Sequence, residues 1–97
     1  LLAYAESVAA GWDLRSGIIR GALDESNAPA WVFAELDRVD AYLSDKDVAN
    51  LTDKQKGEMV GLMVRLSGPV FRAAIQQYAP GLLNVANVLP VLAFLGL

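Results

Sequence analysis

The last quarter of the chain carries no charge. All 19 charged side chains (11 acidic and 8 basic) lie between Glu6 and Arg72, and residues 73–97 contain none. Leaving large apolar side chains in water forfeits roughly 1.5–3 kcal/mol each. Residues 73–97 are therefore expected to be buried in the chain's own fold, in a protein partner or in lipid.

The chain is also short and rich in apolar residues. Its 97 residues allow one domain, and a chain of this length buries only about 60–65% of its unfolded surface. Apolar residues make up 55% of the sequence, above the ~45–50% of soluble domains. This excess predicts a surface that is covered by a partner.

Composition excludes several classes of function. The net charge of −3 argues against a nucleic-acid partner, because binding phosphates requires clustered lysine and arginine. Cysteine and histidine are absent, so disulfides and thiolate chemistry are excluded and the usual general base near neutral pH is missing. No enzymatic activity, cofactor or small-molecule substrate is expected.

Two segments in the first half have helical patterns. Residues 2–23 are rich in alanine, with a break expected near Gly11 or Gly17, because glycine weakens a helix by up to ~1 kcal/mol. The clearest amphipathic helix spans residues 29–43 and has its apolar face at Val32, Leu36, Val39 and Leu43. The chain begins at Leu1, as a processed, excised or trimmed product would, and residues 1–10 lack the basic region of a signal peptide.

Capping signals mark the starts of these helices. Ser26 or Asn27 is expected to cap the helix of residues 29–43, with Pro29 in its first turn. Residues 44–47 are expected to add a short helical turn. Thr52-Asp-Lys-Gln55 is a T-x-x-Q capping box that predicts the start of another helix.

That third helix is expected to run to Tyr78 with a kink at residues 67–69, where proline removes one internal hydrogen bond. Four apolar positions along it, Met59, Leu62, Leu66 and Val70, are expected to pack against the stripe of residues 29–43. The pattern as a whole predicts an all-α fold, a small bundle of three to five helices with a kinked third helix and an apolar C-terminal helical arm.

The sequence predicts one domain, residues 1–97, with an amphipathic helical body (1–78) and an apolar arm (79–97). Ala79-Pro80-Gly81 ends the third helix, and Tyr78 just before it is the best candidate for an interface anchor. The apolar side chains expected to dock on a partner are Leu82, Leu83, Val85, Val88, Leu89, Val91, Leu92, Phe94 and Leu95.

The sequence does not match a calcium-binding loop of the EF-hand type. Asp45, Asp47, Asn50 and Asp53 supply oxygen ligands, but an EF-hand needs glycine at the sixth position and glutamate at the twelfth. The chain has Asn50 and Lys56 there. These residues are better explained as helix caps in a solvent-exposed loop between two helices.

The remaining polar motifs have structural interpretations. Glu35, Asp37 and Asp40 form the wet side of an amphipathic helix, and the serines have no histidine to activate them. Gly57 and Gly61 form a G-x-x-x-G pair that permits close helix approach, in soluble proteins as in membranes.

Arg65 and Arg72 lie seven residues apart on the third helix. They would meet acidic groups, phosphate or lipid headgroups on a partner. The alternative, which we favour, is a structural role, in which they pair with the acidic helix of residues 29–43 or snorkel from an otherwise buried helix.

The tail is a poor membrane span. Residues 82–97 reach about 24 Å as a helix, against a hydrocarbon thickness near 30 Å. Counting from Ala73 gives about 37 Å but includes two prolines and four amides, and no Lys or Arg follows to set an orientation.

The function expected from the sequence is that of a non-catalytic structural subunit that docks through its C-terminal segment, with a protein partner or as a homo-oligomer. Small all-helical subunits of this description occur among virion components, although no motif here carries that analogy. The alternative is a small membrane-associated protein with residues 82–97 in lipid.

Overall fold

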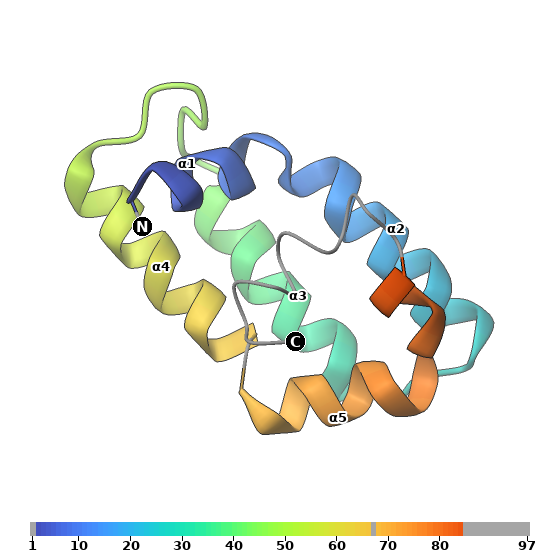
Figure 1. The fold of residues 1–97 in the computed structure, drawn as a ribbon. Coiled ribbons are helices and arrows are strands. Elements are labelled where there is room, and N and C mark those ends of the chain that lie inside the picture. The colour runs from blue at the N-terminus through green and yellow to red at the C-terminus, as the bar shows by residue number, and fades with distance from the viewer. Residues whose placement is uncertain (1, 67, 85–97) are drawn as a thin grey trace.

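A computed structural model describes residues 2–66 and 68–84, which form helices and loops without a strand, as expected for an all-α chain. The helices are α1 (Leu2–Ala10), α2 (Trp12–Glu25), α3 (Ala30–Leu43), α4 (Asp53–Leu66), α5 (Pro69–Tyr78) and the short 3₁₀ helix η1 (Pro80–Asn84). Figure 1 shows α3 between α2 and α4, with α1 across one end of the bundle and α5 across the other.

The break in the first helical segment falls at Gly11, one of the two positions predicted, and α2 continues through Gly17. The Arg15 guanidinium lies over Gly11, where a Cβ atom would collide with it. From there Arg15 Nη1 donates to the carbonyl oxygen of Ser7 at 3.3 Å. Glycine at this position therefore leaves room for the Arg15 side chain to cross the junction between α1 and α2.

Ser26 and Asn27 end α2, so the prediction that either caps the following helix is wrong. Asn27 has a φ of 54°, in the left-handed region that Asn tolerates better than most residues. Backbone N–H groups of Asn27 and Ala28 donate to the carbonyls of Asp24 and Leu23 at 3.1 and 3.0 Å. This is a Schellman arrangement, which satisfies the carbonyls at a helix C-terminus.

Pro29, which was expected in the first turn of α3, is instead its N-cap, in extended conformation. The predicted stripe on α3 is confirmed, because all four of its apolar side chains are buried. They join a single hydrophobic cluster to which every helix contributes, and whose largest fully buried members are Trp12, Ile19, Leu23, Leu36, Met59, Met63 and Ile75.

The capping box at the start of α4 is confirmed. The Thr52 backbone N–H donates to Gln55 Oε1 at 2.9 Å, and the Gln55 N–H donates to Thr52 Oγ1 at 3.2 Å. Residues 44–47, by contrast, do not form the expected helical turn. The Asp47 carboxylate there accepts from Ala49 N–H at 3.2 Å and Asn50 Nδ2 at 3.0 Å, which stabilises a turn in place of a helix.

The predicted kinked third helix is two helices. α4 ends at Leu66, and α5 restarts at Pro69 with Gly68 as an extended N-cap. The restart shifts the phase of the apolar positions, so Phe71, Ala74 and Ile75 face the core. Val70, predicted as a core residue by continuing the periodicity of α4, is 67% exposed.

Ion pairs join the helices at the rim of the bundle. Lys56 on α4 pairs with Glu6 on α1 at 3.2 Å, across the α1–α4 packing seen in Figure 1. Arg65 on α4 pairs with Glu35 on α3 at 2.8 Å. No helix in the described ranges combines the length and the apolarity needed to cross a membrane.

Candidate interaction surface

The most polar hollow lies between the α1–α2 junction and the C-terminal end of α3. It holds about 520 Å³ and is lined in part by Trp12, Asp13, Ser16 and Asp40. The Trp12 indole N–H donates to Asp40 Oδ1 at 2.6 Å, and Arg20 Nη2 donates to the other oxygen, Oδ2, of the same carboxylate. With one of these hydrogen bonds on each oxygen, the Asp40 carboxylate anchors the buried indole of Trp12.

This anchor gives a first prediction. Asp40→Ala leaves the buried Trp12 N–H without its acceptor, and we expect the free energy of unfolding to fall by about 1–3 kcal/mol. Asp40→Asn keeps an oxygen acceptor and loses only a partly exposed ion pair, so the loss should stay below about 1 kcal/mol. Urea denaturation of both variants measures the difference, and equal losses would contradict the role given to the indole hydrogen bond.

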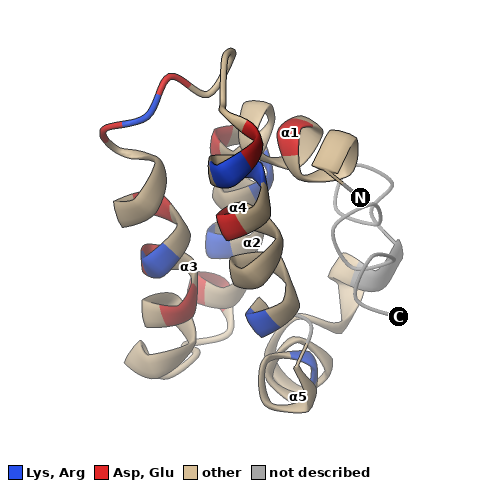
Figure 2. Cartoon of the chain, turned by 90° about the vertical axis from the view of Figure 1, so that its left-hand side faces the viewer, with Lys and Arg blue, Asp and Glu red and all other residues tan. Residues whose placement is uncertain are grey.

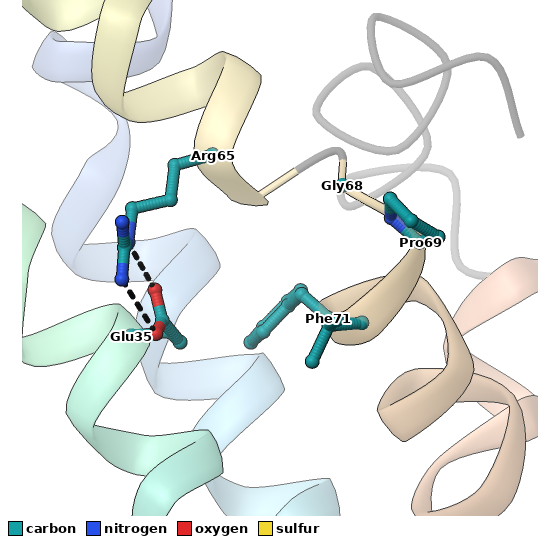
Figure 3. Close-up of a pocket in the computed structure, with 6 residues that line it drawn as sticks. Glu35, Arg65, Gly68, Pro69 and Phe71 are labelled. Carbon is teal, nitrogen blue, oxygen red and sulfur yellow. Dashed lines mark hydrogen bonds and ion pairs between the residues drawn. The ribbon is translucent and has the colours of Figure 1, made fainter.

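A second hollow, of about 280 Å³, lies at the turn between α4 and α5. Figure 3 shows the Glu35 carboxylate facing the Arg65 guanidinium, with the Phe71 ring beside them. Arg65 Nε and Nη2 donate to the two carboxylate oxygens at 2.8 and 3.3 Å. These hydrogen bonds, with the nearby negative charge, raise the pKa of Arg65 and engage two of its five N–H groups.

The pairing interpretation of the basic residues is thus confirmed for Arg65. Arg72, by contrast, is exposed on α5 and makes no ion pair with any residue in the described ranges. The carboxylates predicted to form the wet side of α3 also pair with arginines: Asp37 and Asp40 share Arg20, and Glu35 holds Arg65.

The third hollow is uncharged and lies along one flank of α5. We call its lining the α5 patch; the hollow holds about 420 Å³ and is formed by Trp31, Pro69, Val70, Ala73, Ala74, Gln77 and Tyr78. Trp31, in the first turn of α3, is 46% exposed, and Val70 is 67% exposed. A large aromatic and an aliphatic side chain therefore meet water side by side with no charged group in the lining.

The α5 patch adjoins the charged surface at one edge, because Pro69 and Val70 also line the hollow of the Glu35–Arg65 ion pair. Figure 2 shows acidic and basic residues spread over α3, α4 and the loop that joins them. Arg72, the basic residue of α5, lies two positions after Val70 and therefore about 160° around the helix from it.

The chain matches no protein-family model, and comparison with curated proteins and with solved structures finds no match. Its surface chemistry has therefore to be argued from its own residues.

The predicted docking residues divide into two groups. Leu82 is 3% exposed and belongs to the chain's own hydrophobic cluster, while Leu83 lies in η1. The others lie outside the described residues: Val85, Val88, Leu89, Val91, Leu92, Phe94 and Leu95. Ala79 is also buried in the core, so the packed body extends beyond Tyr78, to Leu82.

Gly57 and Gly61 do not form a helix–helix contact within the described fold. Both are exposed on α4, and a Cβ atom at either position would have open space around it. The described residues also contain no group of three acidic side chains able to hold a metal ion, in line with the cap and turn roles of Asp47 and its neighbours.

Periodicity does not reveal the α5 patch. Trp31 precedes the stripe on α3 by one position, and Val70 fits the phase of α4, so both resemble core residues in sequence. The signal that identifies Val70 as exposed is Gly68-Pro69, once it is taken as the start of a new helix with a new phase.

Proposed function

We propose that this chain is a non-catalytic structural protein, a small helical subunit that assembles with further copies of itself. Two uncharged parts of the chain are proposed to take part in docking, the α5 patch and residues 85–97. The observation that carries the proposal is the α5 patch, where Trp31 and Val70 are exposed without a charged residue in the lining.

An exposed apolar hollow favours association. Large contiguous apolar surface is uncommon on monomers and marks interaction sites, and interface cores are depleted of charge and enriched in aromatic residues. The half-exposed Trp31 is of the residue type most enriched among interface hot spots.

The test compares the native mass of the full chain with that of two variants over micromolar concentrations. Val70→Asp places a carboxylate in the α5 patch, and we expect it to weaken self-association at least tenfold, which corresponds to about 1.4 kcal/mol. Val64→Asp is the matched control, because Val64 is 55% exposed on α4 and does not line the patch.

Two results would overturn the proposal. One is a wild-type chain that stays monomeric at tens of micromolar and binds neither detergent nor a dye for apolar surface. The other is flotation of the wild-type chain with liposomes together with a blue shift of its tryptophan fluorescence, because that result would assign the uncharged surface to lipid.

A further inference from the structure

A fourth hollow lies between α2 and the corner where α5 meets η1, and we call it the α2–η1 groove. It holds about 530 Å³, and its lining includes Gly17, Ile18 and Gly21 on one wall and Tyr78, Pro80 and Leu82 on the other. Figure 1 shows η1 beside the middle of α2. The one charged residue of the lining, Glu25, lies at the C-terminal end of α2.

At Gly17 and Gly21, the α2 wall of the groove has no side chains and exposes the helix backbone. They are one helical turn apart and exposed, and a Cβ atom at either position would meet no described atom within 4 Å. Neither glycine has a backbone angle that requires glycine, although each weakens α2 by up to ~1 kcal/mol relative to alanine. Among the described residues nothing requires glycine at these two positions, and an occupant of the groove would.

We propose that residues 85–97 of a second copy of the chain occupy the α2–η1 groove, an inference that rests on the proposed self-assembly. The described chain stops at Asn84, two residues beyond Leu82, a residue of the groove wall. Residues 85–97 follow directly and carry no charge, which matches a lining with a single charged residue.

The length of the segment fits the groove. Thirteen residues reach about 20 Å even if fully helical, and the α2 wall from Gly17 to Ser26 measures about 15 Å, so the segment is long enough to fill it. A second copy as its source follows from the proposed self-assembly, because reciprocal exchange of the segment gives a closed dimer.

The test uses leucine substitutions at matched glycines in the full chain. Gly21→Leu fills the groove, whereas Gly57→Leu adds the same side chain on α4, where a Cβ atom also has open space. Both substitutions should retain the helical circular dichroism signal, and in dilute solution each should raise the melting temperature slightly, because leucine favours a helix more than glycine does. We expect Gly21→Leu to weaken self-association at least tenfold and Gly57→Leu to leave it unchanged.

Wild-type-like self-association of Gly21→Leu would overturn the inference, and the proposed function would still stand if Val70→Asp disrupts assembly. A monomeric wild type would overturn both.

Cross-linking identifies the source of the occupant, because the chain has no cysteine. Ser26→Cys, in the groove lining, is mixed with isotope-labelled Gly96→Cys, and a disulfide between the two copies is expected. Ser44→Cys, exposed at the end of α3, is the control and should not cross-link. In the Ser26→Cys, Gly96→Cys double variant, a predominantly intramolecular disulfide would overturn the choice of a second copy.

Discussion

Leu36→Ala should lower the free energy of unfolding by about 2–5 kcal/mol. Leu36 is fully buried at the centre of the α3 stripe, with Val32 and Val39 beside it. Removing its side chain forfeits the transfer free energy of the lost atoms and leaves a cavity that neighbours on several helices cannot close. Small domains are stable by only about 5–15 kcal/mol, so this single change should remove a large share of the total.

Leu14→Ala is the matched control, because Leu14 lies on α2 with 64% of its surface exposed. The same deletion there creates no cavity, and its cost should stay within about 0.5 kcal/mol. Chemical denaturation of the two variants, compared at equal protein concentration, measures the contrast. A loss below about 0.5 kcal/mol for Leu36→Ala would mean that the α3 stripe faces solvent or an optional partner.

Local signals in the sequence predicted much of the fold. The apolar spacing of α3 and the Thr52–Gln55 capping box depend on residues within four positions of one another, and both are present as expected. The break at Gly11 was predicted for the same reason, since glycine acts on its own helix. These features require no knowledge of the tertiary structure.

The positions that were predicted wrongly lie at junctions, where the same residues could either end one helix or start the next. Ser26 and Asn27 fit an N-cap of α3 by composition, but Asn27 takes the left-handed conformation that ends α2. At Gly68-Pro69 the sequence is compatible with a kink or with a new helix. The choice depends on whether Phe71 and Ile75 reach the core, which is a property of the whole bundle.

The interaction surfaces could be anticipated only in part. Loss of charge after Arg72 indicated that the C-terminal part of the chain is the uncharged side of the molecule. The α5 patch and the α2–η1 groove, however, each join residues more than 30 positions apart in sequence, as with Trp31 and Val70 or Gly21 and Leu82. Contacts of that kind follow from helix packing and have no local signature.

The stability of a Leu82 variant tests where the packed body ends and the docking segment begins. Leu82 is 3% exposed and packs in the same cluster as Ile75 and Ala79, so we expect Leu82→Ala to destabilise the chain by about 2–5 kcal/mol. Because these contacts lie within one copy, most of the loss should already be present in dilute solution.

Leu89→Ala provides the comparison. Under the proposed assembly, Leu89 is buried only against another copy, and the stability gained by association grows with protein concentration. Its substitution should therefore cost little in dilute solution and progressively more as the protein is concentrated. Thermal unfolding of both variants at micromolar and at hundred-micromolar concentration separates the two roles. If Leu82→Ala also cost little in dilute solution, Leu82 would belong to the docking segment, and the body would end at Tyr78 as the sequence predicts.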